Sequence, residues 1–184
     1  KGVRTGGTER FVSEAWLKPS LQIGELAESW ELQTEPLAAV FHLRKNVMWQ
    51  DCPGVMTSRP FNAEDVVYAY NRLIESPKLN KGYIDFVDRA EATDEHTVTF
   101  YFNSFNAEWD LRLGYGFYSA ILPREVAEKG AQDWRNACGT GPFKLADYED
   151  GIRGVYKRNP DYWGKVAIGG ESYQLPFVDE LIIQ

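Results

Sequence analysis

The sequence predicts an α+β fold, in which antiparallel strands and a few short helices are mostly segregated along the chain. Three observations support this class. Residues 97–102, TVTFYF, alternate between apolar and polar side chains, which is typical of a half-buried strand. Residues 59–74 carry a helix start signal followed by apolar side chains at three- and four-residue spacing. Turn-forming residues at 94–96 and 150–151 separate segments rich in Val, Thr and aromatic residues, which favours hairpins.

The first part of the chain is predicted to form strands. Residues 9–24 mix aromatic and apolar side chains without a period, so we expect them to be irregular apart from a short strand at 10–13. Two strands are predicted at 26–32 and 39–43, joined by a turn that contains Pro36. Residues 47–50 are expected to continue the same sheet.

The helix that follows is the best-marked element of the sequence. Asn62 can cap it, because its side-chain oxygen can accept a hydrogen bond from a free backbone N–H of the first turn. Glu64 and Asp65 place negative charge at the positive end of the helix dipole, and we interpret both as N-terminal charges without a catalytic role. Pro77 lies beyond the end and cannot continue the helix. The apolar stripe consists of Val66, Val67, Tyr70, Leu73 and Ile74.

The second half alternates short helices and hairpins. A short helix is predicted at 106–114 and another at 124–129, where Pro123 suits the first turn and Gly130 ends the helix. A second hairpin is predicted from strands at 143–148 and 154–158. A last strand is expected within 177–184.

Composition and charge exclude several classes of protein. The chain has 184 residues, of which 43% are hydrophobic and 26% charged, as in soluble globular domains. The net charge is -7 and no basic run occurs, which argues against nucleic acid or an anionic membrane surface as a partner. No apolar stretch approaches the roughly 20 residues that a membrane-spanning helix needs.

The sequence offers little for catalysis or metal binding. The only histidines, His42 and His96, fall in a predicted strand and a turn, and no paired Cys or His spacing predicts a metal site. Residues 139–142, GTGP, lack the Lys-Ser/Thr of a phosphate-binding loop, so we interpret them as a tight turn. Cys52 and Cys138 could pair in an exported protein, but nothing in the sequence brings them together and two separate thiols are favoured.

Five motifs occur along the chain: LAESWE at 26–31, FHLRKNVMW at 41–49, PFNAEDVV at 60–67, GTGPF at 139–143 and RNPDYWG at 158–164. With these motifs, in this order, the chain resembles the extracellular solute-binding proteins of family 5, the peptide and nickel type that feeds ABC importers. The departures are local: Asn46 and Asn62 replace the usual Gly and Thr, and the loop at 50–59 is longer than is common.

The resemblance implies that the chain is part of lobe one of a two-lobed periplasmic-binding-protein-like fold. It implies that residues 1–39 are a flanking segment of the main lobe, that 40–147 form a small α+β subdomain, and that 148–184 return as a hairpin and strand toward the main lobe. The sequence shows no initiating Met, signal peptide or lipoprotein cysteine. We therefore expect a fragment or processed form of an exported protein, periplasmic or on the cell surface, with lipid anchoring of the full-length protein left open.

The resemblance also implies a function. We expect the substrate-binding component of an ABC importer, which holds a small solute, by default a peptide, between two lobes and delivers it to a membrane permease. No catalysis, cofactor or metal is expected. The missing second lobe of the same protein is an expected partner, and nucleic acid is not.

The ligand contacts are predicted in an aromatic segment, LGYGFYS at 113–119. Glycine allows close backbone approach and Tyr combines a flat ring with a hydroxyl group, so Tyr115, Phe117 and Tyr118 are the candidates. Trp49, with the long loop after it, is a further candidate for the rim of the same cleft. The competing interpretation is that Phe117 and Tyr118 are core residues.

Other functions stay open on the sequence alone. The same family includes receptors for oligosaccharides and nickel chelates. A glycoside hydrolase domain would need two carboxylates roughly 5–10 Å apart in a groove, and the spacing of Glu108 and Asp110 is better explained by a polar helix face. A structural or interaction domain would show an exposed apolar patch of several hundred Å².

Overall fold

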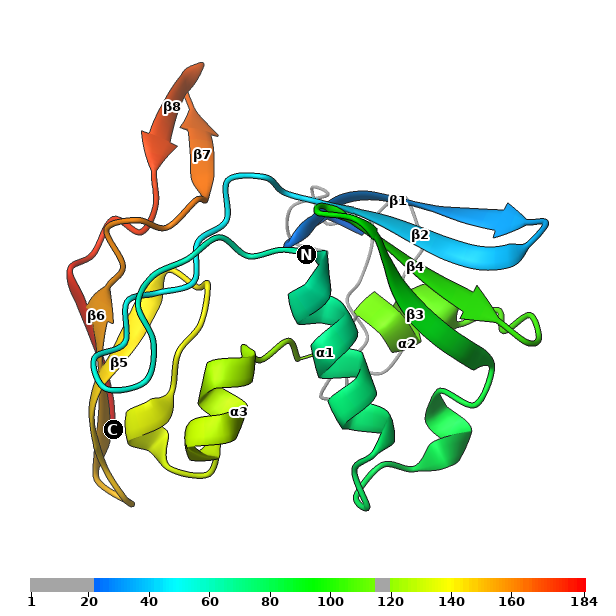
Figure 1. The fold of residues 1–184 in the computed structure, drawn as a ribbon. Coiled ribbons are helices and arrows are strands. Elements are labelled where there is room, and N and C mark those ends of the chain that lie inside the picture. The colour runs from blue at the N-terminus through cyan, green and yellow to red at the C-terminus, as the bar shows by residue number, and fades with distance from the viewer. Residues whose placement is uncertain (1–21, 115–119) are drawn as a thin grey trace.

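The structure is a computed structural model that describes residues 22–114 and 120–184. Its largest sheet is four-stranded and antiparallel, with the order β1-β2-β4-β3. The strands are β1 (Ala27–Thr34), β2 (Leu37–Leu43), β3 (Val87–Asp94) and β4 (Thr97–Phe102). Figure 1 shows this sheet beside helix α1 (Ala63–Ile74), with the short helix α2 (Trp109–Gly114) close by. The class predicted from the sequence, α+β, is confirmed.

The central strands of this sheet, β2 and β4, bury apolar side chains in the core. In β4, Val98, Phe100 and Phe102 are all buried, as the alternation predicted. Phe41 of β2 lies opposite Val98 in the register and meets the ring of Phe100 edge-on at 5.7 Å. Tyr70 of α1 meets Phe100 edge-on at 5.4 Å, so the helix and the two middle strands share one aromatic core.

Helix α1 begins with the cap that the sequence predicted. The Asn62 side chain accepts from the backbone N–H of Asp65, and the Asp65 side chain accepts from the backbone N–H of Asn62, which makes a capping box. These two bonds satisfy donors that the first turn of a helix leaves free. The helix then ends at Ile74, before Pro77, as expected.

A second, three-stranded sheet has the order β5-β6-β9. It contains β5 (Phe143–Glu149), β6 (Arg153–Arg158) and β9 (Glu180–Ile183), and Figure 1 shows it on the opposite side of α1 from the first sheet. Helix α3 (Arg124–Gly130) lies between the two, and Gly130 ends it with a φ of 115° that favours glycine. Leu181, Ile182 and Ile183 of β9 are 42%, 49% and 54% exposed, so both faces of this strand carry exposed apolar side chains.

Two features differ from the sequence-based expectations. Residues 47–50 do not continue the sheet, because among the described residues Met48 forms only an isolated bridge with Pro60. A two-stranded hairpin of β7 (Lys165–Ile168) and β8 (Glu171–Gln174) was not predicted, although its Gly169-Gly170 turn is a hairpin signal. Figure 1 shows this hairpin projecting from the body. The short strand expected at 10–13 lies outside the described residues.

Both expected boundaries between parts of the chain fall inside strands. The boundary after residue 39 falls within β2, and the boundary after residue 147 falls within β5. Strand β1, assigned to the flanking segment, pairs along its length with β2. The division into a flanking segment, a subdomain of residues 40–147 and a returning part stays a prediction.

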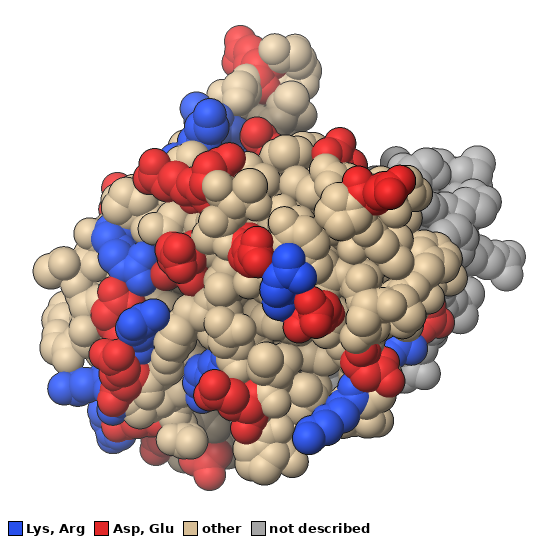
Figure 2. All heavy atoms as spheres, turned by 45° about the vertical axis from the view of Figure 1, so that its right-hand side comes forward, with Lys and Arg blue, Asp and Glu red and all other residues tan. Residues whose placement is uncertain are grey.

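The surface carries both signs of charge. Figure 2 shows acidic and basic side chains interspersed over the face in view, without an extended patch of one sign. Ion pairs such as Arg89 with Asp88 and Glu91 place opposite charges side by side. Within the ranges that the structure describes, no helix has the length and apolar character needed to cross a membrane.

Candidate functional site

A cavity of about 290 Å³ lies between the first sheet and helices α1 and α2. Its walls are mostly apolar, because buried side chains of β2, β4 and α1 form its floor. Ligand pockets in proteins are typically apolar with a few placed polar groups, and this cavity has that character. The residues that line it include Trp30, Phe41, Tyr70, Asp110, Gly114 and Ile121.

Two charged groups at the cavity, Asp110 and Arg112, have partners on the protein. Asp110 accepts a hydrogen bond from the side-chain amide of Gln22 at 2.5 Å. Arg112 pairs with Glu108 at 2.8 Å and also donates to the backbone carbonyl of Tyr83 at 2.8 Å. These bonds fix α2 against its neighbours, so both carboxylates considered for a hydrolase, Glu108 and Asp110, are engaged in local structure.

The predicted ligand residues Tyr115, Phe117 and Tyr118 lie outside the described residues. The described chain stops at Gly114 and resumes at Ala120, and both of these residues line the cavity.

Trp109 anchors the helix that leads into this segment. Its ring lies 6.1 Å from that of Phe41 and 6.3 Å from that of Phe102. These contacts hold α2 against the first sheet, beside the cavity.

Trp49 lies in the core. Its side chain is 1% exposed, and its ring meets that of Phe61 edge-on at 5.9 Å. The indole N–H donates to the Asp65 carboxylate at 2.8 Å, which satisfies the polar end of the ring. In this structure the ring offers no surface to a solute, and a ligand contact by Trp49 stays a prediction that its burial does not support.

Asp65 does more than place a negative charge at the start of α1. Besides the capping box and Trp49, it accepts from the Arg59 guanidinium at 2.8 and 3.0 Å, and it is only 6% exposed. Arg59 also bonds both oxygens of Glu125 in α3, at 2.7 and 2.9 Å. Arg59 thus connects the start of α1 to α3 with two bidentate contacts.

These contacts shift two pKa values in opposite directions. Hydrogen bonds to Glu125 and then to Asp65 raise the pKa of the Arg59 guanidinium above its ordinary value. The hydrogen bond from Arg59 lowers the pKa of the Glu125 carboxyl below its ordinary value of 4.5. Both shifts favour the charged forms, so the contacts stabilise the fold and do not prepare a proton donor or acceptor for catalysis.

The cysteine prediction was wrong. Cys52 and Cys138 form a disulfide bond with a Cα–Cα distance of 6.1 Å. The pairing follows from backbone contacts far apart in sequence, because the N–H of Gln50 donates to the carbonyl of Gly139 at 3.0 Å and draws the two loops together. No local pattern in the sequence signals this contact.

The glycine-rich residues 139–142 and His96, which were considered for phosphate binding and catalysis, have structural roles. Residues 139–142 form the turn that leads into β5, as predicted, and the Gly141 carbonyl accepts bonds from two side-chain amides. His96 lies in the β3–β4 turn with its backbone N–H bonded to Asp94 at 2.8 Å, and its carbonyl accepts from Leu43. No cluster of three or more metal-ligating side chains occurs in the parts of the chain that are described.

Comparison with known proteins fits this arrangement. The family model of the bacterial extracellular solute-binding proteins, family 5 (middle), matches residues 22–184. The chain belongs to this family. The resemblance in the five sequence motifs is therefore confirmed over nearly the whole described chain.

Curated relatives are about one-third identical to this chain over the aligned residues. A di/tripeptide-binding protein of Pseudomonas aeruginosa UCBPP-PA14 is 33% identical over 168 residues, which cover 79% of this chain and 31% of that protein. The dipeptide-binding protein of Escherichia coli K12 is 32% identical over 158 residues, covering 76% of this chain and 29% of that protein. The chain spans about a third of the length of these family-5 relatives.

Solved structures of periplasmic binding proteins show the same fold. A periplasmic binding protein from Helicobacter pylori, in complex with the peptide STSA, matches with a TM-score of 0.68 and 25% identity over 86% of this chain and 33% of that one. A binding protein of A. tumefaciens R10, in complex with agropinic acid, matches with a TM-score of 0.64 and 27% identity over 86% of this chain and 30% of that one. This chain is thus part of a lobe of a two-lobed binding protein.

Proposed function

We propose that the protein is the substrate-binding component of an ABC importer and that it binds short peptides without chemical conversion. The observation that carries this proposal is the family match over residues 22–184, together with a relative 33% identical that is named for di- and tripeptide binding. The contacts of Asp110 and Arg112 add support, because both side chains are held by structural partners.

The solute is proposed to lie in a cleft between two lobes, against the segment that contains Tyr115, Phe117 and Tyr118. The support is the attachment of this segment at Gly114 and Ala120, both at the wall of the cavity. An extended peptide can pair through its backbone, which tolerates many side chains, while aromatic rings supply flat apolar contact. Closure of the two lobes about a hinge would then enclose the solute.

The proposed partners follow from this role. A membrane permease of the ABC type would receive the solute, and the second lobe of the same protein would supply the opposite wall of the cleft. The protein would act outside the cytoplasm, in the periplasm or at the cell surface, with or without a lipid anchor. No cofactor takes part.

Native mass spectrometry of the full-length protein, purified gently enough to retain its ligand, tests the solute class. Adducts with masses that sum amino-acid residues would support a peptide importer. Hexose or pentose masses would replace it with a sugar receptor, and a nickel-containing adduct with a chelate receptor. Hydrolysis of a bound oligosaccharide would contradict a non-catalytic role.

Calorimetric titration with dipeptides tests the proposed contacts. Tyr118→Ala should weaken binding by about tenfold, since a buried aromatic contact is worth about 1–2 kcal/mol. The matched control is Tyr148→Ala, because Tyr148 is 41% exposed on β5 and bonds Asp150 within its own hairpin. Equal affinities for the two variants would contradict a contact by Tyr118.

The 184-residue chain alone should bind such peptides weakly or not at all, because one wall of the cleft is supplied by other parts of the protein. Titration of the isolated chain with the same dipeptides measures this. A micromolar dissociation constant would contradict the expectation and would place the whole site within these residues.

A further inference from the structure

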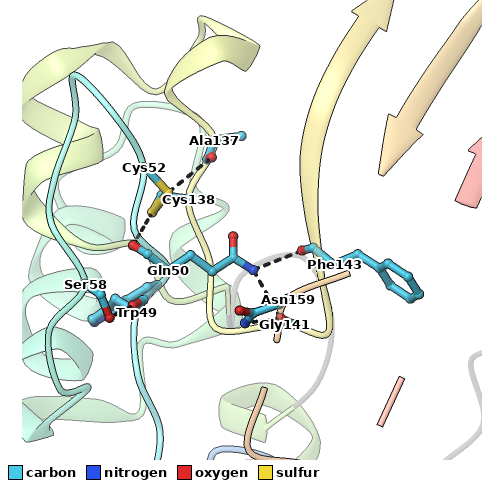
Figure 3. The surroundings of a disulfide bond; sticks show 9 residues. All are labelled: Trp49, Gln50, Cys52, Ser58, Ala137, Cys138, Gly141, Phe143 and Asn159. Carbon is cyan, nitrogen blue, oxygen red and sulfur yellow. Dashed lines mark hydrogen bonds between the residues drawn. A yellow bond between two sulfur atoms is a disulfide. The ribbon is translucent and has the colours of Figure 1, made fainter. Parts of the chain in front are cut away.

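Five residues form a connection between the loop after β2 and the second sheet, which we call the joint: Gln50, Cys52, Cys138, Gly141 and Asn159. Figure 3 shows the disulfide and the side-chain amide of Gln50 reaching the same stretch of chain, the turn that enters β5. The joint lies outside the cavity described above, since none of these residues lines it.

Gln50 supplies most of the polar contacts of the joint. Its backbone N–H donates to Gly139 at 3.0 Å, and its side-chain amide donates to the carbonyls of Gly141 and Phe143 at 3.1 and 3.0 Å. The residue is only 5% exposed. A buried amide that loses such partners costs about 1–3 kcal/mol, so these bonds hold the turn in place independently of the disulfide.

The disulfide holds the same turn a second time. Cys138 directly precedes Gly139, and Cys52 lies two residues after Gln50. Two different attachments, one covalent and one through hydrogen bonds, therefore join the same two short segments. While the covalent attachment is intact, the bonds of Gln50 are largely redundant for keeping the segments together.

The sulfur atoms also lie close to backbone acceptors. Cys138 Sγ is 3.3 Å from the carbonyl oxygen of Gln50, and Cys52 Sγ is 3.9 Å from that of Ala137. In the disulfide neither sulfur carries a hydrogen, so these are contacts only. After reduction each sulfur gains a hydrogen, and each thiol, which is a weak donor, would have a backbone carbonyl acceptor already in reach.

We propose that the Cys52–Cys138 disulfide is redox-sensitive and that the two segments of the joint stay in contact in both redox states. In the reduced protein, Gln50 is the positioning residue whose hydrogen bonds keep the segments together. A dithiol reductant would attack one sulfur through a mixed disulfide. The S–S bond breaks, two S–H groups form, and the reductant leaves as a disulfide after giving two electrons and two protons. Both cysteines are half-buried, and Cys52 is followed by exposed Pro53 and Gly54, which leaves the bond within reach of a small dithiol.

This inference does not depend on the solute that the protein binds. It predicts that reduction makes local opening between the loop after β2 and the turn into β5 more frequent, without separating the two segments. Since the second sheet and the first are both parts of one lobe, the effect is a change in local opening and not a loss of fold.

Hydrogen exchange of the full-length protein tests the inference, read at the backbone amides of Gln50 and Asn159. The variant Gln50→Met keeps the side-chain volume and removes the amide donors. With the disulfide intact it should raise exchange at these amides by less than about tenfold. After reduction with a dithiol, the same variant should raise exchange by about a hundredfold or more relative to the reduced parent.

Two further comparisons complete the test. The pair Cys52→Ser and Cys138→Ser keeps a donor at each position, and should exchange more slowly at these amides than the pair Cys52→Ala and Cys138→Ala. Gln33→Ala is the matched amide control, because Gln33 lies exposed in β1 and its side-chain amide donates to the carboxylate of Glu31. It should leave exchange at the joint unchanged in both redox states.

Equal effects of Gln50→Met in the oxidised and reduced protein would overturn the proposal, because the two attachments would then not substitute for each other. Full loss of protection at both amides on reduction of the parent protein would overturn it as well. Identical exchange rates in the serine and alanine pairs would show that hydrogen bonds from the thiols do not help to hold the reduced joint. That comparison stands even if Gln50→Met fails to fold.

Discussion

Gln50 and Asn159 donate their side-chain amides to the same acceptor, the carbonyl oxygen of Gly141, at 3.1 and 3.0 Å. One amide comes from the loop after β2 and the other from the end of β6. The turn into β5 is therefore held from both sides, and its Gly-rich sequence serves backbone contact and not phosphate binding. Asn159 adds a backbone bond from its N–H to Pro142 at 2.8 Å.

Asn159→Ala should lower the free energy of unfolding by about 1–3 kcal/mol, because Asn159 is only 2% exposed and its removal leaves the Gly141 carbonyl with one partner fewer. Urea denaturation measures the change. Asn103→Ala is the control, since Asn103 makes a similar bond to the carbonyl of Asp85 at an exposed position. A smaller loss for Asn159→Ala than for the control would contradict the expectation.

Asp65→Ala should cost about 2–4 kcal/mol. It removes the partner of the indole N–H of Trp49, half of the capping box, and a carboxylate that neutralises Arg59. Glu64→Ala, one position earlier and exposed, should change stability by less than about 0.5 kcal/mol. Denaturation of the two variants side by side gives the comparison, and similar losses would mean that Asp65 acts only as a helix-dipole charge.

Asn62→Ala should destabilise α1 by about 1 kcal/mol, because the N–H of Asp65 loses its side-chain acceptor. Asn62→Thr should recover most of this loss, since a hydroxyl oxygen can accept the same bond. The thermal midpoint of each variant reports the difference. If alanine and threonine were equally stable, the cap would not matter in this context.

Stability should fall with acid in a way that Glu125 partly controls. The pKa of Glu125 is lowered in the folded protein from its ordinary value of 4.5 by the Arg59 hydrogen bond. The unfolded state therefore takes up a proton first as the pH falls, so the stabilisation is complete above pH 4.5 and is lost below it, through the lowered folded pKa.

Glu125→Gln should accordingly cost about 1 kcal/mol or less at pH 7, since the pair is partly exposed, and the difference from the parent should shrink as the pH drops below 4.5. Urea midpoints from pH 7 to pH 3 measure it. Glu128→Gln, also in α3, is the control. A difference that grew with acid would reverse the assigned direction of the pKa shift.

Trp49→Phe should lower the free energy of unfolding by about 1–3 kcal/mol, because Asp65 loses a buried donor and the core loses volume. Peptide affinity measured on the same variant, at a temperature where it is folded, tests the predicted ligand contact separately. Unchanged affinity would assign Trp49 to the core alone, whereas a tenfold loss would restore it to the cleft.

Elements with local signals were predictable from the sequence. Strand β4 has the bounds 97–102 that its alternation predicted, and α1 begins after Asn62 as its cap predicted. Both signals lie within a few residues of the feature that they specify. The exposed hairpin β7–β8 lacks such a pattern, since its side chains need not alternate when neither face is buried.

Features that depend on distant residues were not predictable in the same way. The pairing of Cys52 with Cys138 and the bond of Arg59 to Glu125 join segments that the fold alone brings together. The cavity likewise draws its walls from separate elements, so no local pattern in the sequence marks it as a whole. Trp49 illustrates the ambiguity, because a tryptophan beside a long loop suits a binding rim and a core equally well.

Strand β9 has a practical consequence. Its apolar side chains are exposed on both faces, and among the described residues it pairs only with β6, which leaves one backbone edge open. An open, apolar edge recruits other chains. Anyone who produces this stretch of polypeptide by itself should expect association that rises with concentration, and a lysine in place of Ile182 is the simplest change to keep such a preparation dispersed.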